Sequence, residues 1–258
     1  MEKINNIRYE SVPIIKKKEK IVTENINFDK DIKIIKTFLP KYRQGQLILE
    51  IRTPLKYIDK SCQILLCDYN RNGIMDLFCI KNSDDRTAVH ILNGVNNYKS
   101  IFLSILTILH NYEENWEFKI WKSGKGKPDI YCIKKNKTGS NSTEIHILNG
   151  NNNYQSFLFQ SGTILHETDD NWNFEIGDYN INRRHNIYCI YKKNTYSKYT
   201  KIYILNGDNY QSFSSKIITN LYKTDNNWEF LLRDYNNDGK LDLYCINKNV
   251  KILNFKWG

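Results

Sequence analysis

The chain has 258 residues, of which 40% are hydrophobic and 13% aromatic, so it can build a sizeable core and is not expected to be disordered. Its formal net charge is +10, from 38 Lys and Arg against 28 Asp and Glu. No stretch approaches the roughly 18 consecutive apolar residues that a membrane span requires, so we expect no membrane-spanning helix.

Residues 1–44 differ from the rest of the chain in their charge. They contain 11 basic and 6 acidic side chains, including the run Lys16–Lys20 with four Lys and one Glu. We interpret them as a basic N-terminal extension, either a solvated segment or an arm that meets an anionic polymer or a membrane surface. The first residues contain no apolar signal core, so we expect a protein that is cytoplasmic or secreted by a non-classical route.

Three sequence markers recur at a common spacing in residues 45–258, which we predict to form one domain. The string Ile-Leu-Asn-Gly occurs three times and ends at Gly94, Gly150 and Gly207. An Asn-Trp pair recurs with its Trp at 116, 172 and 228, and a Cys-Ile pair recurs with its Cys at 79, 132, 189 and 245. A shared period of about 56 residues is typical of an architecture built from one repeated supersecondary unit.

Each repeat predicts four short β-strands. In the third repeat, four segments are rich in β-branched and aromatic residues and are separated by polar turns. The expected strands are 172–177, 186–192, 200–205 and 211–221. Asn206-Gly207, between the last two, is a pair typical of hairpins. Four antiparallel strands per unit indicate a blade of a β-propeller, so the predicted fold class is all-β.

The last of the four repeats is one strand short. It begins at Trp228, and its third strand is expected near 251–254. Residues 46–55 match the fourth strand of an earlier repeat, with Thr53 aligned with Thr163. We therefore predict a four-bladed β-propeller in which this early strand completes the last blade and closes the ring, which would hide exposed sheet edges.

The loop after the first strand of each repeat carries oxygen-bearing side chains. In the last repeat they occupy loop positions 1, 3, 5 and 9, with Gly at position 6 and a backbone carbonyl at position 7, a pattern that suits Ca²⁺. The residues concerned are Asp234, Asn236, Asp238, Lys240 and Asp242. The first repeat has a weaker version in Asp68, Asn70, Asn72 and Asp76. The alternative is that these side chains only cap backbone amides in turns, as we expect in the two middle loops.

Aromatic and amide side chains at recurring positions are candidates for ligand binding. Trp116, Trp172 and Trp228 open their repeats, where they either pack between blades or offer a stacking face to a sugar ring or a base. The Tyr-Gln pairs that follow the Asn-Gly turns are expected to be exposed and to contribute to the same sites. These are Tyr154, Gln155, Tyr210 and Gln211.

The six cysteines do not form a metal-binding pattern. Four recur once per repeat, where pairing between separate sheets is not expected, and we interpret them as small buried hydrophobes. Cys62 and Cys67 are additional and lie close together on one strand. This usage favours a reducing compartment.

No signature of catalysis is present. The sequence contains no nucleophile elbow, no zinc-binding His-Glu pair and no phosphate-binding Gly-rich loop. His90 and His146 occupy equivalent positions, but Tyr203 replaces them in the third repeat, which argues against a shared catalytic or metal-binding role. We predict that the protein is not an enzyme.

Three stretches of the second repeat, 138–150, 154–157 and 162–168, resemble FG-GAP and VCBS-type repeats of fungal and bacterial proteins, and the resemblance covers about residues 46–258. It implies an integrin-like propeller with Ca²⁺ in the loops that carry Asp68 and Asp234, and in some members a lectin activity with sugar sites between blades. The chain departs from the family in having four blades, where relatives commonly have seven, and two loops without a full ligand set.

We expect a lectin-like propeller whose repeated shallow sites bind carbohydrate with avidity. The alternative is a protein-interaction or structural scaffold that docks through residues 1–44. Electrostatic binding to nucleic acid is not expected, because the positive charge is spread along the chain.

Overall fold

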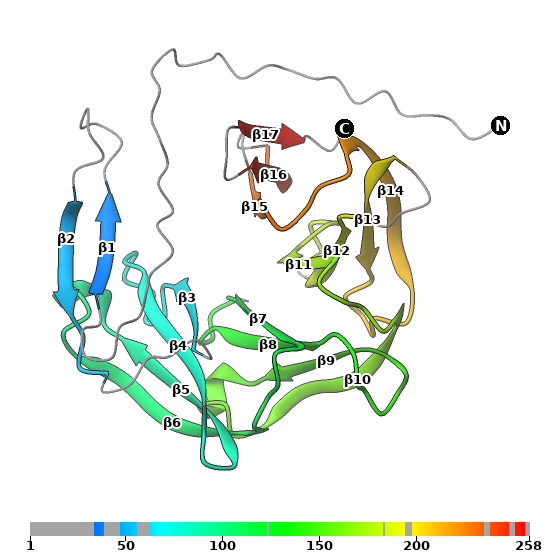
Figure 1. The fold of residues 1–258 in the computed structure, drawn as a ribbon. Coiled ribbons are helices and arrows are strands. Elements are labelled where there is room, and N and C mark those ends of the chain that lie inside the picture. Colours follow the sequence, from blue (N-terminus) through cyan, green and yellow to red (C-terminus); the bar gives the residue numbers. More distant parts are fainter. Residues whose placement is uncertain are drawn as a thin grey trace. The chain divides into compact units, whose positions relative to one another are not determined.

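The computed structural model describes residues 34–38, 47–55, 62–122, 124–182, 184–193, 198–234, 238–247 and 251–255, with the backbone alone for 34–38, 47–52 and 251–255. These residues form β-strands and two short 3-10 turns, so the all-β fold class is confirmed (Figure 1). Within the part of the chain that is described, no helix has the length and apolar character that a membrane span requires.

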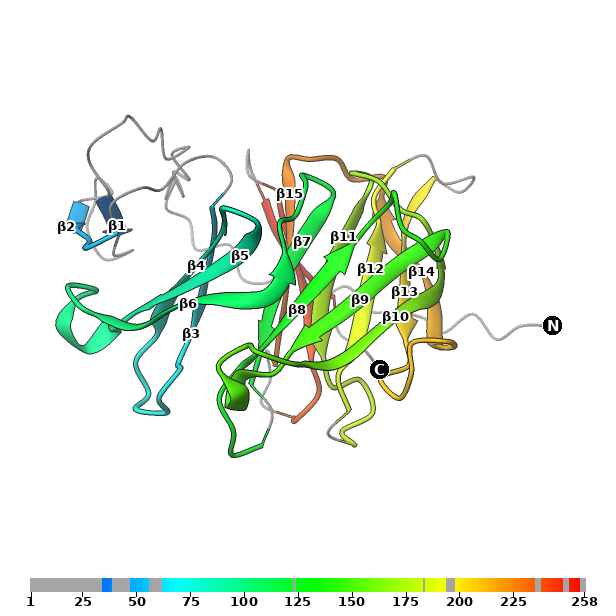
Figure 2. The same cartoon turned by 90° about the horizontal axis from the view of Figure 1, so that it is seen from below.

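The described residues belong to two compact units. The first unit contains the residues up to 135 together with 144–161, and the second contains 136–143 and the residues from 162 onward. Four sheets follow one another along the chain, and we call them modules 1 to 4. Figures 1 and 2 show the strands of each sheet side by side.

The first three modules have four strands each, paired in chain order. Module 1 consists of β3 (Gln63–Cys67), β4 (Asp76–Ser83), β5 (Arg86–Leu92) and β6 (Ile101–His110). Module 2 consists of β7 (Trp116–Trp121), β8 (Asp129–Lys134), β9 (Ser142–Leu148) and β10 (Phe157–His166). Module 3 consists of β11 (Trp172–Gly177), β12 (Asn186–Tyr191), β13 (Tyr199–Leu205) and β14 (Phe213–Tyr222). The four strands predicted for the third repeat are confirmed to within two residues at each end.

Module 4 has three described strands, β15 (Trp228–Arg233), β16 (Asp242–Asn247) and β17 (Lys251–Phe255). The expected fourth strand, β2 (Leu47–Arg52), pairs antiparallel with β1 (Ile34–Phe38) in a separate two-stranded sheet. Strand β1 falls inside the predicted basic extension, which was expected to have no repeat partner. The predicted pairing of 46–55 with 251–254 is not among the described strand pairs.

We define the front face of each module by the recurring Cys on its second strand. The residue opposite that Cys on the first strand, and the residues two places before and after it, lie on this face. In module 2, Phe118 lies opposite Cys132 and is 1% exposed, because it packs in one apolar cluster with Phe78 and Ile91 of module 1. The second unit has the same arrangement, where the front face of module 4 packs on module 3. That cluster includes Phe230, Leu232 and Cys245 from module 4 and Tyr188, Ile190 and Ile204 from module 3.

The Ile-Leu-Asn-Gly motif ends the third strand of modules 1 to 3, and its Gly is required by a close approach of two backbones. A Cβ atom at Gly94 would lie 2.1 Å from the carbonyl oxygen of Met75, and one at Gly150 would lie 2.1 Å from that of Pro128. The connection to the fourth strand spans several residues and contains a 3-10 turn in modules 1 and 2, η1 (Gly94–Asn96) and η2 (Gly150–Asn152). The Asn-Gly pair therefore marks a hairpin, but not one with a two-residue turn.

The structure corrects the interpretation of Cys79 as an unpaired buried hydrophobe. Cys79 on β4 forms a disulfide with Cys62, whose Cα atom lies 6.1 Å away. Cys62 occupies the position that Trp116 has in module 2, one place before Gln63 in the pairing with the second strand. The other recurring cysteines, Cys132, Cys189 and Cys245, are buried and form no disulfide, as predicted.

Candidate functional site

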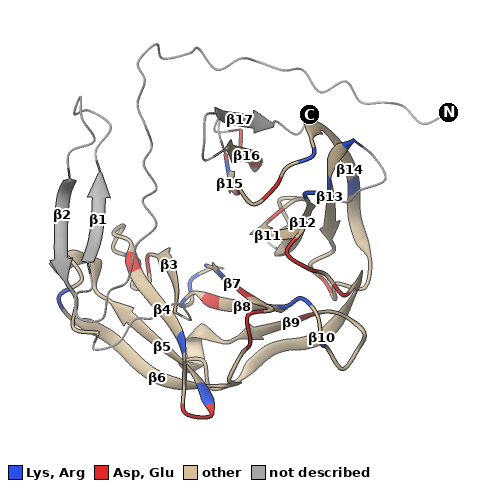
Figure 3. Cartoon of the chain, in the orientation of Figure 1, with Lys and Arg blue, Asp and Glu red and all other residues tan. Residues whose placement is uncertain are grey.

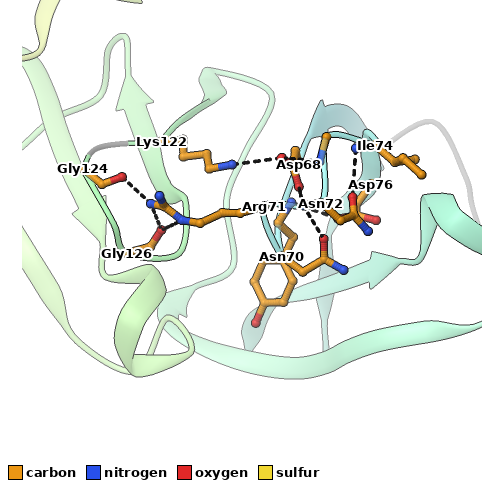
Figure 4. Close-up of polar contacts among 11 residues, drawn as sticks. Asp68, Asn70, Arg71, Asn72, Ile74, Asp76, Lys122, Gly124 and Gly126 are labelled. Atoms are coloured by element: carbon orange, nitrogen blue, oxygen red, sulfur yellow. Dashed lines mark hydrogen bonds and ion pairs between the residues drawn. The ribbon is translucent and has the colours of Figure 1, made fainter.

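The loop from Asp68 to Asp76 is shaped by hydrogen bonds from its own backbone (Figure 4). Asp68 accepts from the N–H groups of Asn72 (3.1 Å) and Gly73 (3.1 Å), and the Asn72 side chain accepts from the N–H of Ile74 (2.9 Å). Gly73 has a φ of +83°, which glycine adopts at low cost. The polar side chains at loop positions 1 and 5 therefore first of all stabilise a turn.

Two cationic side chains link this loop to the corresponding loop of module 2, one from each module (Figure 4). The Nζ atom of Lys122 lies 3.1 Å from Oδ2 of Asp68. In the other direction, the Arg71 guanidinium donates to the carbonyl oxygens of Gly124 and Gly126 in the corresponding loop of module 2. Burial by itself would raise the pKa of Asp68, but hydrogen bonds from Lys122 and from the N–H of Gly73 lower it below its ordinary value.

The carboxylate at loop position 9 has a separate structural role. Asp76 is fully buried, and its two oxygens accept from the N–H groups of Tyr69 (2.9 Å) and Gly94 (2.8 Å). Asp129, its equivalent in module 2, accepts from the N–H of Gly150 (2.8 Å), and burial raises its pKa despite this bond. Position 9 thus ties the start of the second strand to the Asn-Gly turn.

The first loop, as arranged, does not fit a bound Ca²⁺. Its first carboxylate holds an ammonium group, and both oxygens of its last carboxylate already accept backbone N–H groups. Of the described residues, no three or more His, Cys, Asp or Glu side chains gather as a metal site would require. Asn70 is exposed, and its side chain accepts from the N–H of Asn72 (3.3 Å).

The last loop has the same turn geometry as the first. Asp234 accepts from the N–H groups of Asp238 (3.2 Å) and Gly239 (2.9 Å), and Asp238 accepts from the N–H of Lys240 (2.8 Å). Asn236 lies outside the described residues, and Asp242 is buried at the start of β16. The described carboxylates of this loop do not gather as a metal site would require either, so a cation at this loop stays a prediction from its oxygen-bearing side chains.

The Tyr-Gln turns join neighbouring modules, which corrects the prediction that their Tyr side chains are exposed. Tyr154 is fully buried, with its hydroxyl donating to the carbonyl of Pro128 (3.1 Å) and its own carbonyl accepting from Ile108 of module 1 (3.1 Å). Gln155 is exposed, but its amide donates to the carbonyl of Leu106 (2.7 Å). A buried ring leaves no face for a sugar.

The same joint recurs in the second unit. Tyr210 is buried, its hydroxyl donates to the carbonyl of His185 (3.2 Å), and its carbonyl accepts from the N–H of Ile164 (3.0 Å). The side-chain amide of Gln211 donates to the carbonyl of Gly162 (2.6 Å). The recurrence of these bonds explains why the Tyr-Gln pair repeats in the sequence.

Trp116 is partly exposed and has polar groups around it. Its indole stacks on the Phe118 ring, with centroids 6.4 Å apart, and lies 5.2 Å from the His146 ring. The Nζ atom of Lys134 lies 5.7 Å from the indole centroid. An aromatic face with hydrogen-bonding groups beside it is the usual composition of a small-molecule site.

His146, which lies beside Trp116, forms hydrogen bonds with two further polar side chains. Its Nε2 atom lies 3.3 Å from a carboxylate oxygen of Glu144, and its Nδ1 atom lies 2.8 Å from the amide nitrogen of the exposed Gln160. Burial lowers the pKa of His146 below its ordinary value, and Lys134 adds to this effect while Glu144 opposes it. Lys134, Glu144, His146 and Gln160 were not predicted as site residues. The strand register would have placed two of them near Trp116, because Lys134 lies opposite Trp116 and Glu144 lies opposite Lys134.

Of the other two tryptophans, Trp172 differs from Trp116 because it is buried, whereas Trp228 is similar. Trp172 is 5% exposed, because Tyr191 stacks on it with centroids 4.4 Å apart and Tyr203 lies 5.6 Å away. Trp228 is partly exposed and packs against the apolar cluster of the second unit. The structure thus leaves two of the three predicted stacking residues accessible.

Comparison with known proteins gives no assignment: no protein-family model and no curated protein matches the sequence.

Proposed function

We propose that this chain is a non-catalytic binding module that recognises carbohydrate. The observation that carries the proposal is the partly exposed Trp116 indole, which lies beside Lys134 and His146, with Glu144 and Gln160 hydrogen-bonded to His146. A pyranose ring has an apolar face that packs on an aromatic ring, while its hydroxyls need donors and acceptors at the edge.

The proposed fold is a four-bladed β-propeller of the FG-GAP/VCBS type, whose ring is closed by residues 47–55 pairing with β17. Module 4 has three described strands, where each of the other modules has four. Thr53 supports the proposal, because its hydroxyl is buried and has no hydrogen-bond partner among the described residues. Its equivalents Thr107 and Thr219 donate to the third strand of their sheets, to Thr87 (3.0 Å) and Thr200 (2.8 Å).

Leu55 also behaves as part of an outer strand. It is buried in one cluster with Leu77 and Leu92 of module 1, against which Tyr98 packs. Leu109, on the outer strand β6, shares a cluster with Tyr154 in the same way. This similarity supports residues 47–55 as an outer strand on which module 1 docks.

Calcium is proposed at the last loop only, with Asp234, Asn236, Asp238, the Lys240 carbonyl and Asp242 as the ligands. The turn of this loop supports the proposal, and Lys122 argues against the first loop. Titration with Ca²⁺ should raise the melting temperature of the full chain, and Asp234→Asn should remove that shift. An equal shift in both proteins would contradict the proposed site.

The test of carbohydrate binding is a glycan array probed with the full chain and with three variants. Trp116→Ala should lose the signal of the bound glycans, and Trp228→Ala should lower it if the fourth module also binds. Tyr222→Ala removes another exposed aromatic side chain, on β14, and serves as the matched control. No bound glycan, or equal binding by wild type and Trp116→Ala, would overturn the proposal.

A protein ligand is the second candidate, and the outer strand β6 favours it. Phe102, Leu106 and Ile108 on this strand are all exposed. Exposed large apolar side chains that lie together are common at protein interfaces. Deleting residues 1–44 distinguishes the candidates. A carbohydrate-binding module should keep its glycan signal, whereas a scaffold that docks through this segment should lose its partner.

A further inference from the structure

One end of modules 1 and 2 concentrates positive charge in two adjoining loops, 68–76 and 121–129. The outer strands β6 and β10 of these modules are tan in Figure 3, because they contain no Lys, Arg, Asp or Glu. The loops carry four basic residues: Arg71, Lys122, Lys125 and Lys127. Of the three carboxylates in the same loops, Asp76 and Asp129 are buried and bound to backbone N–H groups. The third, Asp68, is paired with Lys122.

The charges of Arg71 and Lys127 are held in place by neutral partners. Arg71 binds backbone carbonyls of Gly124 and Gly126 through Nε and Nη2. Lys127 donates to the side-chain oxygen of Asn153 (3.0 Å) and lies over the Tyr69 ring, 5.1 Å from its centroid. Carbonyl and amide oxygens fix these cations without neutralising them. Their electrostatic attraction for an anion therefore remains, and less side-chain entropy is lost on binding.

Lys125 adds a third positive charge and is exposed. We propose that Arg71, Lys125 and Lys127 form a binding surface for the carboxylate groups of an acidic polysaccharide. The inference rests on the proposed carbohydrate function and adds the class of sugar. The guanidinium of Arg71 is suited to a carboxylate because its planar N–H groups match the two oxygens.

An acidic polysaccharide fits this surface better than a nucleic acid. Arg71, Lys125 and Lys127 have no carboxylate partner among the described contacts, although the two loops together hold four basic against three acidic side chains. So small a set of cations suits a short run of uronate units, whereas nucleic-acid binding relies on a longer row of phosphate contacts. Exposed amides of Asn70 and Asn72 lie in the same loop and can meet sugar hydroxyls.

The experiment is isothermal titration of the full chain with three probes, namely an oligogalacturonate, a maltooligosaccharide of equal length and a single-stranded DNA oligonucleotide. Oligogalacturonate binding should weaken about tenfold in Lys125→Glu and further in the double variant with Arg71→Gln, and it should weaken with added salt. Lys223→Glu makes the same charge change on an exposed lysine after β14 and should leave the affinity unchanged.

Equal weakening by Lys125→Glu and Lys223→Glu would overturn the proposal, because only the net charge would then matter. Tighter binding of the DNA oligonucleotide than of oligogalacturonate, with the same loss in Lys125→Glu, would assign the surface to nucleic acid instead. Maltooligosaccharide binding that is lost in Trp116→Ala and kept in Lys125→Glu reports on the proposed function alone. Unchanged oligogalacturonate affinity in Lys125→Glu would overturn this inference and leave that function standing.

Discussion

The front face of module 1 differs from the same face of modules 2 and 4. Ile64 is 39% and Leu66 59% exposed, whereas Phe118 is 1% and Phe230 2% exposed at the position of Ile64. In modules 2 and 4 a preceding module covers the face. The residues are apolar in every case, so module 1 has the composition of a covered face. Leu55 packs on its second and third strands, but no described module covers Ile64 and Leu66 on the first strand. This difference is what the proposed ring closure explains.

The largest expected effect is the loss of a packed front-face side chain. Phe118→Ala should lower the free energy of unfolding by about 3–5 kcal/mol, because it leaves a cavity between modules 1 and 2. Ile64→Ala should cost about 2 kcal/mol if a module covers it, against less than about 0.5 kcal/mol for an exposed side chain. Chemical unfolding of both variants measures the difference, and a negligible cost at Ile64 would argue against closure.

Module 1 also has the disulfide where the other modules have Trp. Cys62→Ser should lower the free energy of unfolding by about 3 kcal/mol, because the bond closes a loop with a sequence separation of 17. A thiol reductant should destabilise the wild type by a similar amount and leave Cys62→Ser unchanged. Cys67→Ser, on the same strand, is the control. A wild type that is insensitive to reductant would contradict this role.

The Tyr joint gives a smaller effect that should again differ between modules. Tyr154→Phe removes a buried hydroxyl and leaves the Pro128 carbonyl without its donor, at a cost of about 1–2 kcal/mol. Tyr98→Phe removes the equivalent bond to Met75 in the first module, at a partly exposed site. Thermal unfolding should rank Tyr154→Phe as the more harmful change. The reverse order would mean that the first joint is the more deeply buried in solution.

The smallest effect concerns His146 beside Trp116. Its pKa is lowered in the folded chain, so unfolded chains bind more protons and stability should fall as the pH drops below the ordinary value of 6.5. His146→Gln should flatten this part of the stability profile. The pKa of His185 is also lowered by burial, so this residue should still titrate in the variant and cause the remaining loss of stability at low pH. A profile unchanged by the substitution would contradict the assignment.

The sequence predicted the strands well because a strand depends on local alternation and turn residues, and the repeat multiplied that signal. The predicted strand 172–177 coincides with β11. The prediction from sequence failed for side chains whose burial depends on contacts with a neighbouring module. Polar turns normally favour exposure, but Tyr154 adopts a φ of +63°, and its ring is buried.

The candidate site was predictable only in part for the same reason. Trp116 and Trp172 have the same sequence context, and only the neighbours on the next strands decide that Tyr191 covers Trp172. The disulfide also depends on a pairing across strands. Cys62 and Cys79 are separated by 17 residues and approach only when β3 and β4 are in register.

Ring closure is tested most directly by a cross-link between β2 and β17. The registers of the module 3 sheet, transferred to module 4, place Ile51 opposite Ile252, as Ile217 lies opposite Ile202. A variant carrying Ile51→Cys and Ile252→Cys should form this disulfide within one chain under mild oxidation, detected as a linked peptide by mass spectrometry of the monomer. Absence of that peptide in a folded, oxidised monomer would contradict the closed ring.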